Sequence, residues 1–232
     1  MTKLSKFIAN SGYCSRRKAT ELIKNGQVTV NGTITTEPFY EVQPTDAIKA
    51  ENKLIKQDAP LYFLFNKTTD LICTASDPQD RPTVIDLFKK FKARLYPIGR
   101  LDRNTTGLII ITNDGELTQK LSHPKFNVSK TYHVTTHKPV KPDHIQSLKT
   151  GVRLEDGMMK VDKVRKISST KNTLSVTIHS GKKHIVKRLF KQLGYFVKKL
   201  DRTEFATLTK KGLPLGAYRM LSKEEINKLH NL

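Results

Sequence analysis

Apolar positions in the first 35 residues show a helical period twice and then alternate along two short segments. Helical spacing occurs at Leu4, Phe7 and Ile8 and, after a break at Ser11-Gly12, at Ala19, Leu22 and Ile23. Ser15 is placed to cap the second helix, because its hydroxyl can accept a free backbone N–H, and Asn25-Gly26 ends that helix. Alternation flanks Asn31-Gly32, a dipeptide suited to a tight hairpin turn. The pattern predicts two helices followed by a hairpin.

The chain from Lys53 to Pro60 is polar and without period, which predicts a linker before a region of mixed pattern. Apolar runs predict buried strands at Leu61–Phe65 and Leu108–Thr112, and further strands are predicted at Tyr132–Val134 and Leu174–Ile178. Helices are predicted at Pro82–Phe91 (Val84, Ile85, Leu87, Phe88 and Phe91 inward), from the Asn113-Asp114-Gly115 turn to Leu121, and at Lys183–Leu193 before Gly194. Irregular alternation of strands and helices favours an α+β fold. We therefore expect two domains, residues 1–58 and residues 59–232.

The charge of the chain narrows its function more than any other compositional feature. Lys and Arg number 42 against 21 Asp and Glu, which gives the 232 residues a formal net charge of +21. Such a surplus attracts polyanions, because each phosphate that is neutralised releases counterions. Composition therefore favours nucleic-acid binding, and the alternative is a ribosomal-type surface or one that only confers solubility.

Other features exclude several classes of protein. The longest apolar runs, such as Leu61–Phe65, fall far short of the roughly 20 residues that a membrane-spanning helix needs. Only two cysteines, Cys14 and Cys73, exclude a disulfide scaffold and a four-cysteine zinc site. The first residues carry lysines with no apolar stretch behind them, which argues against secretion. We expect a cytoplasmic protein with no membrane partner.

The N-terminal segment concentrates positive charge on its predicted helices. Within residues 1–32, Glu21 is the single acidic residue among six basic ones, Lys3, Lys6, Arg16, Arg17, Lys18 and Lys24. Arg16, Arg17 and Lys18 open the second helix, where cations oppose the helix dipole unless an anion lies nearby. A solvated helix face is the simpler alternative. The whole segment resembles the S4 RNA-binding domain, which implies that these six residues contact structured RNA.

A polar loop that leads into an apolar strand carries the most informative residues. Residues 99–112 read Gly-Arg-Leu-Asp-Arg-Asn-Thr-Thr-Gly-Leu-Ile-Ile-Ile-Thr, and Asp102 lies between Arg100 and Arg103. Cations near a carboxylate favour its ionised form, which suits a nucleophile or a base. Without further information, such a loop is more often a structural network of ion pairs than an active site.

This stretch resembles the G-R-L-D-x-x-T-x-G-L signature of pseudouridine synthases, in particular the RsuA/RluB type that acts on ribosomal RNA. The resemblance implies that Asp102 is the catalytic residue, that Arg100 is the arginine of the signature, and that Thr105 and Gly107 support the loop. Members of this family commonly carry an S4 domain in front, as this chain does. The resemblance also implies a mixed, mainly antiparallel sheet flanked by helices in the second domain.

Two further motifs fit the same family. Lys130-Thr131-Tyr132 resembles its K-x-Y element, which implies that Tyr132 packs against the target base; a core aromatic on a strand is the alternative. Residues 181–190 resemble the element in which a basic residue, here Lys187, pairs with the catalytic aspartate. Ile185 departs from the usual Gln or Glu of that element. The additional candidates for RNA binding are Arg103, Lys182, Lys183 and Arg188.

The family's reaction breaks the N1–C1′ bond of a uridine and rejoins the base through C5, and it requires no cofactor or metal. The chain lacks a P-loop motif, and on a strand His133 and His137 lie about 13 Å apart, too far for one metal. Asp102 is expected either to attack C1′ or to remove the C2′ proton, with Lys187 and Arg100 orienting it. We expect a monomer that acts on ribosomal RNA, with 23S slightly favoured over 16S.

Two other functions fit part of the sequence. A non-catalytic RNA-binding or ribosome-assembly protein would need only the S4-like segment and the basic surface, but it would not need the signature around Asp102. An N-glycosidase that releases uracil would need a second carboxylate to activate water, and none of the motifs supplies one.

Overall fold

The computed structural model describes residues 2–167 and 170–232, and these form two compact units. The smaller unit contains the chain up to Leu61 together with Phe88–Leu95 and Asn113–Gly115, and the larger unit contains the remainder. The boundary predicted between residues 58 and 59 remains a prediction, because two segments from further along the chain join the smaller unit.

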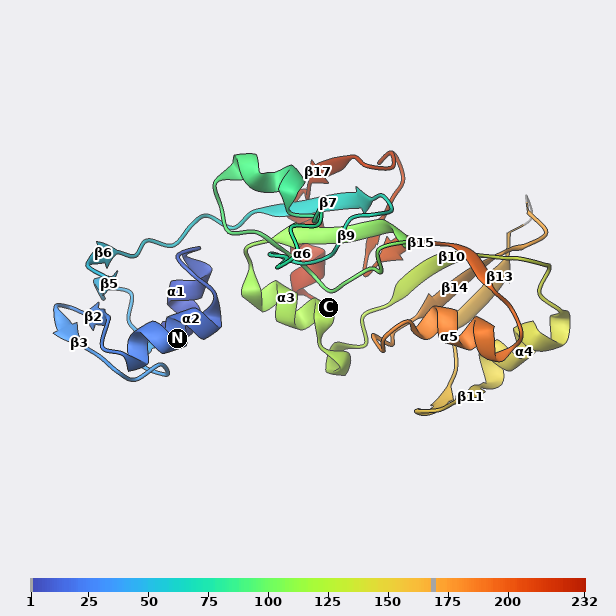
Figure 1. Cartoon of the computed structure of the whole chain (residues 1–232), viewed down its shortest axis with the longest axis horizontal. Coiled ribbons are helices and arrows are strands. Elements are labelled where there is room, and N and C mark those ends of the chain that lie inside the picture. The colour runs from blue at the N-terminus through green and yellow to red at the C-terminus, as the bar shows by residue number, and fades with distance from the viewer. Residues whose placement is uncertain (1, 168–169) are drawn as a thin grey trace. The chain divides into compact units, whose positions relative to one another are not determined.

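The N-terminal segment folds as the hydrophobic pattern predicts (Figure 1). Its helices and strands are β1 (Thr2–Lys3), α1 (Leu4–Asn10), α2 (Arg16–Lys24), β2 (Val28–Val30), β3 (Thr33–Ile34), β4 (Glu41–Val42), β5 (Ile48–Ala50) and β6 (Lys53–Leu54). The Ser15 hydroxyl accepts the Lys18 N–H at 3.1 Å and so caps α2. The apolar faces of both helices pack on β2 and β5 in one buried cluster.

The predicted linker at residues 53–60 is partly wrong. Lys53 and Leu54 form β6, which pairs antiparallel with β5, and the Ile55 N–H donates to the Ile48 carbonyl at 2.8 Å. Ile55 is buried in the core of the smaller unit. Alternation over only two or three residues is too short to be recognised in the sequence, so the strand was not predicted.

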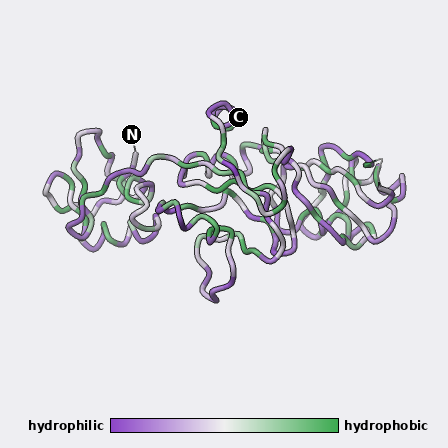
Figure 2. The backbone as a smooth tube through the Cα atoms, turned by 90° about the horizontal axis from the view of Figure 1, so that it is seen from above, coloured by the Kyte–Doolittle hydropathy of each residue, from purple (hydrophilic) through white to green (hydrophobic). Residues whose placement is uncertain are grey.

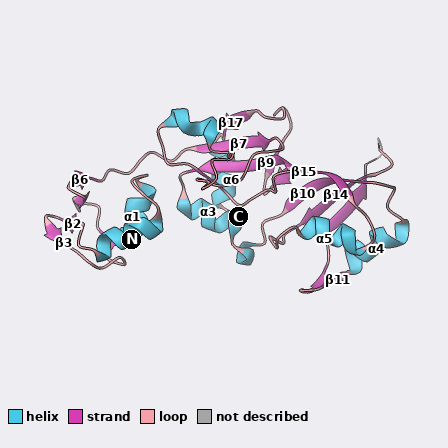
Figure 3. Ribbon diagram, in the orientation of Figure 1, coloured by secondary structure: helices cyan, strands magenta, loops and turns pink. Residues whose placement is uncertain are grey.

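A nine-stranded sheet forms the centre of the larger unit (Figure 3). Its strands are β7 (Tyr62–Lys67), β8 (Tyr96–Pro97), β9 (Thr106–Thr112), β10 (Lys130–Thr136), β13 (Lys163–Lys166), β14 (Thr173–Ile178), β15 (Val197–Phe205), β16 (Leu208–Thr209) and β17 (Tyr218–Met220). The order is β13-β14-β10-β15-β9-β7-β17, with β8 beside β9 and β16 beside β15. Among these pairs, β15 and β9 alone run parallel within the described residues. The α+β class with a mainly antiparallel sheet is therefore confirmed.

Helices and one separate hairpin flank this sheet. They are η1 (Asp86–Phe91, a 3-10 helix), α3 (Gly115–Ser122), η2 (Pro124–Phe126, also 3-10), α4 (Pro142–Thr150), the hairpin β11 (Val152–Leu154) with β12 (Gly157–Met159), α5 (Ile185–Gln192) and α6 (Lys223–His230). Leu117 of α3 and Leu229 of α6 pack with Leu64 and Ile110 in one core cluster, which places both helices on the same face of β7 and β9.

No helix among residues 2–167 and 170–232 has the length and apolar character needed to cross a membrane. Figure 2 shows the reason, since hydrophilic segments interrupt the hydrophobic ones at short intervals along the chain.

Two predicted helices have different bounds in the structure. Residues 82–84 are extended beside Ile72, and the Asp86 carboxylate accepts the Thr83 N–H, so only the 3-10 helix η1 follows. Within η1 Phe88 is buried, whereas Leu87 is exposed. Helix α5 begins at Ile185 rather than Lys183, because His184 adopts the left-handed conformation at the N-cap position.

The parallel contact of β9 with β15 requires a glycine. Gly107 has φ +107°, and a Cβ atom there would lie 2.3 Å from the Arg202 carbonyl oxygen. Gly157 has a similar φ of +112° but open space around it. Replacing Gly157 with alanine strains only the dihedral angle, whereas replacing Gly107 also makes the new Cβ clash with the Arg202 backbone.

Gly107→Ala is therefore expected to lower the free energy of unfolding by about 3 kcal/mol, and Gly157→Ala by about 1 kcal/mol. Urea unfolding of both variants measures the difference. Equal losses would show that the dihedral angle alone, and not the close approach of the strands, makes the glycine necessary.

Candidate active site

A fully buried lysine beneath the Asp102 loop fixes the path of the backbone there. Lys67, at the end of β7, donates from Nζ to the carbonyls of Thr68 (2.8 Å), Asp102 (3.3 Å), Arg103 (3.1 Å) and Thr105 (2.9 Å). Burial lowers the pKa of this ammonium group, and the nearby Cys73 and acidic groups oppose that shift. The role of Lys67 was not predicted, because its partners are backbone carbonyls, and those of Asp102, Arg103 and Thr105 are distant along the chain.

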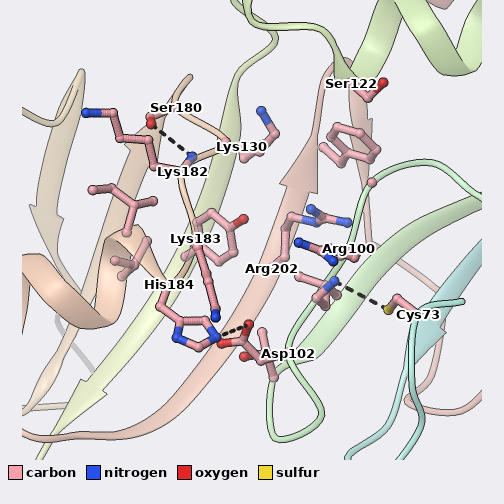
Figure 4. Close-up of a pocket in the computed structure, with 18 of the residues that line it drawn as sticks. Cys73, Arg100, Asp102, Ser122, Lys130, Ser180, Lys182, Lys183, His184 and Arg202 are labelled. Carbon is pink, nitrogen blue, oxygen red and sulfur yellow. Dashed lines mark hydrogen bonds and ion pairs between the residues drawn. The ribbon is translucent and has the colours of Figure 1, made fainter. Parts of the chain in front are cut away.

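Two side chains from the start of α5 contact the Asp102 carboxylate. Lys187 Nζ lies 2.6 Å from Oδ2, and His184 Nε2 lies 3.2 Å from Oδ1, as Figure 4 shows for His184. The Asp102 side chain is 30% exposed, so it lies at the rim of the site and not in the core. The predicted pair of Asp102 and Lys187 is thus brought together by the fold, and His184 is an additional contact. His184 is the left-handed N-cap residue of α5, so helical spacing in the sequence did not point to its contact with Asp102.

A pocket of about 470 Å³ adjoins this carboxylate. Its wall includes Asp102 and Arg100 from the loop, Lys130 from β10 and Arg202 from β15, all labelled in Figure 4. Tyr132 of β10 also lines it. Tyr132 is 8% exposed and lies in the pocket wall. Tyr132 is therefore a buried strand aromatic, as the alternative predicted, and its place in the pocket wall also makes it available to a ligand.

The arginines that flank Asp102 in sequence have other positions. Arg103 pairs with Asp70 at 3.0 Å, and both side chains are exposed. Arg100 is exposed at the pocket wall. The basic side chains that contact Asp102 are instead His184 and Lys187, at the start of α5. The Asp102 loop turns tightly, and the Thr105 N–H donates to the Asp102 carbonyl at 3.0 Å.

Lys130 is a half-buried cation in the wall of the pocket. Its Nζ donates to the carbonyls of Val128 (2.9 Å) and His179 (3.2 Å). Burial lowers its pKa to about 8, the positive charge of Arg202 adds to that shift, and Asp162 opposes it.

This shift predicts a pH dependence of stability. Below pH 8 Lys130 is charged in both the folded and the unfolded protein, and the full cost of burying the charge is present; that cost disappears as pH rises toward 10.5. Relative to Lys130→Met, the wild type is expected to gain about 1 kcal/mol in unfolding free energy between pH 7.5 and 9.5. Urea unfolding measures this, with the exposed Lys163→Met as control. A constant difference between wild type and Lys130→Met would contradict the expectation.

The other residues predicted to bind RNA lie on two surfaces. Arg16, Arg17, Lys18 and Lys24 are exposed along α2, Lys3 is exposed and covers the Phe39 ring, and Lys6 is half-buried. Near the pocket, Lys183 is exposed, whereas Lys182 and Arg188 both pair with Asp156 in the β11–β12 hairpin. The hydrogen bonds from Arg188 and, less strongly, Lys182 lower the pKa of Asp156 to about 2.

The described part of the chain contains no cluster of three or more His, Cys, Asp or Glu side chains arranged to hold a metal ion. Cys73 is a buried thiol at the pocket wall, and its Sγ accepts the Leu101 N–H at 3.3 Å.

Comparison with known proteins decides the family. The RNA pseudouridylate synthase family matches residues 61–192, and the S4 domain matches residues 2–48. The chain belongs to the RNA pseudouridylate synthase family. As a pseudouridine synthase it is an isomerase, and the resemblance seen in its sequence is confirmed.

Individual relatives extend over the whole chain. "Ribosomal large subunit pseudouridine synthase B" of Bacillus subtilis is 41% identical over 237 residues, which cover 100% of this pseudouridine synthase and 97% of the relative. "Dual-specificity RNA pseudouridine synthase RluF" of Escherichia coli is 34% identical and covers 99% and 79%. A crystal structure of a pseudouridylate synthase shares 31% identity with a TM-score of 0.70 over 99% of this chain and 100% of that one.

Proposed function

We propose that this protein isomerises a specific uridine of ribosomal RNA to pseudouridine, with Asp102 as the catalytic residue. The observation that carries the proposal is the Asp102 carboxylate, which lines the same pocket as Tyr132 and pairs with Lys187 at 2.6 Å. The resemblance to relatives named for ribosomal RNA supports the substrate, and the large-subunit name of the Bacillus subtilis relative favours 23S rRNA.

The isomerisation needs one carboxylate positioned at the ribose of the target uridine. The N1–C1′ bond breaks, its electron pair leaves with the uracil, the base turns, and C5 bonds to C1′; the proton lost from C5 is balanced by one gained at N1. Asp102 either attacks C1′, forming an ester bond that breaks when C5 bonds to C1′, or removes the C2′ proton and returns it when C5 bonds to C1′. Lys187 orients the carboxylate through the contact to Oδ2, which leaves part of Asp102 exposed toward the pocket. Water has no part in the balanced reaction, so a second carboxylate is not required.

The pocket suits a nucleoside extruded from its helix or loop. Its volume of about 470 Å³ falls within the range of small-molecule sites, and Tyr132 offers a ring on which the detached base can stack. The exposed cations Arg100, Lys183 and Arg103 at and near the pocket can bind the flanking phosphates. We propose that residues 1–58 form the S4-like domain. The exposed cations of its helix α2 provide a second surface that contacts the RNA.

The remaining expectations form part of the same proposal. Because the isomerisation has no net redox change, no small-molecule cofactor is needed. Asp102 and Tyr132 line one pocket of a single chain, and Lys187 of the same chain contacts Asp102, so a monomer working in the cytoplasm suffices.

The proposal is tested by mapping pseudouridine in 23S and 16S rRNA from cells with and without this gene. Loss of pseudouridine at one site, restored by the wild-type gene, is expected. Mass analysis of the purified protein's RNA product distinguishes the alternatives, since isomerisation leaves the mass unchanged and release of uracil lowers it. An unchanged map together with unmodified RNA in vitro would leave only an RNA-binding protein.

A further inference from the structure

Arg202 carries a buried hydrogen-bond donor that the protein does not use. This residue of β15 is 2% exposed, its Nε donates to the Leu108 carbonyl at 2.6 Å, and its guanidinium lies 4.5 Å from the centre of the Phe205 ring. Among residues 2–167 and 170–232, its Nη2 is one of three buried side-chain polar atoms without a hydrogen-bond partner. An unpartnered guanidinium N–H in the interior is costly, so a ligand that accepts its hydrogen bond would remove that cost.

The register of the sheet places this side chain at the pocket. Arg202 lies directly opposite Tyr132 on β10, and directly paired residues project from the same face of a sheet. Both residues line the pocket, and Figure 4 shows Arg202 there beside the loop that carries Asp102. A second of the three unpartnered atoms, Thr105 Oγ1, also belongs to a pocket residue. Two of the three unpartnered atoms therefore belong to residues that line the site.

The depth of Arg202 selects the part of the nucleotide that it can meet. A phosphate stays attached to the RNA chain and therefore stays near the mouth, where Arg100 and Lys183 are exposed. The base of an extruded nucleotide is the part farthest from the backbone, and it alone reaches a group that is 98% covered. Uracil offers acceptors at its two carbonyl oxygens, O2 and O4, and a guanidinium offers only donors.

We propose that Arg202 is a base-recognition residue, whose Nη2 donates a hydrogen bond to a carbonyl oxygen of the extruded uracil. This inference rests on the proposed function. It also has a consequence for rate. Whether Asp102 attacks C1′ or removes the C2′ proton, uracil departs with the electron pair of the N1–C1′ bond, and its negative charge spreads onto O2 and O4. The hydrogen bond from a buried cation to one of these oxygens is stronger when the departing uracil is negatively charged than when the base is neutral.

The test uses the full-length protein and a synthetic rRNA fragment that the wild type has already been shown to convert. Its target uridine is replaced by 2-thiouridine or by 4-thiouridine, because sulfur is a weaker acceptor than oxygen. Single-turnover rates are compared for wild type, Arg202→Met and Phe205→Leu. The last variant removes the ring beneath the guanidinium but keeps every donor of Arg202. Thermal unfolding of each variant is recorded.

With the wild type, one of the two sulfur substitutions is expected to slow the reaction at least about tenfold. In Arg202→Met the unmodified RNA reacts at least about 30-fold more slowly, its Kd changes less than about threefold, and the same sulfur substitution costs less than about threefold. Phe205→Leu keeps the tenfold sensitivity to sulfur. This non-additivity distinguishes a contact to the base from a structural role.

Three results would overturn the inference. One is a wild type that tolerates both sulfur substitutions within twofold, a result independent of whether Arg202→Met folds. Another is a sulfur penalty that persists in Arg202→Met, which would make Arg202 only structural. In the third, the rate effect of Arg202→Met is non-additive with that of a neutral methylphosphonate at the target phosphate, and additive with that of sulfur; Arg202 would then contact the phosphate and not the base. Because the RNA is one that the wild type converts, none of these results reflects failure of the proposed function.

Discussion

Asp102→Asn is expected to reduce isomerisation by at least about 10³-fold while the Kd for the RNA changes less than about threefold. The amide keeps the shape of the carboxylate and its position opposite Lys187 and His184. It can neither attack C1′ nor accept the C2′ proton, so both routes open to Asp102 are blocked. Single-turnover conversion of the target RNA and filter binding measure the two quantities.

The matched control for this variant is Asp70→Asn. Asp70 is an exposed carboxylate that pairs with Arg103 of the same loop but does not line the pocket. Its loss is expected to change the rate less than about threefold, because an exposed ion pair contributes about 1 kcal/mol or less. Retained isomerisation in Asp102→Asn, or an equal loss in both variants, would reject the role proposed for Asp102.

Lys67→Met is expected to lower the free energy of unfolding by about 4 kcal/mol and the isomerisation rate at least about 100-fold at a temperature where the variant stays folded. The four carbonyls that accept from Nζ lose their buried donor, and each unmet acceptor costs about 1–3 kcal/mol. The loop that carries Asp102 then relaxes, and small displacements of a reacting group are costly to rate. Urea unfolding and single-turnover kinetics give the two values.

Lys166→Met serves as control for the loss of Lys67, since Lys166 is also on a strand of the sheet but is exposed. It is expected to change stability by no more than about 0.5 kcal/mol. If Lys67→Met unfolded at the same urea concentration as Lys166→Met and kept its rate, the carbonyl contacts would not hold the loop.

In the N-terminal segment, residues close together in the sequence were enough to predict the local structure. Ser15 as a cap and Asn31-Gly32 as a turn were predicted from residues within a few positions of each other, and both are present in the structure. The 3-10 helix η1 was predicted as a longer α-helix, because the contacts of residues 82–84 with Ile72 lie outside the window in which a helical period is read. Local patterns predicted these elements, and contacts between segments set the bounds of η1.

The amino-acid sequence by itself determined the α+β class, the basic surface, and the motifs around Asp102, Tyr132 and Lys187, because all of these are carried by residue types and by short spacings. Only the tertiary structure placed Lys67 beneath the Asp102 loop, His184 on its carboxylate and Arg202 opposite Tyr132. The contacts of Lys67 depend on backbone carbonyls, that of His184 on its left-handed conformation at the start of α5, and the position of Arg202 on the register of β10 with β15. None of these leaves a periodic trace in the chain, since each arises when segments distant in sequence pack together.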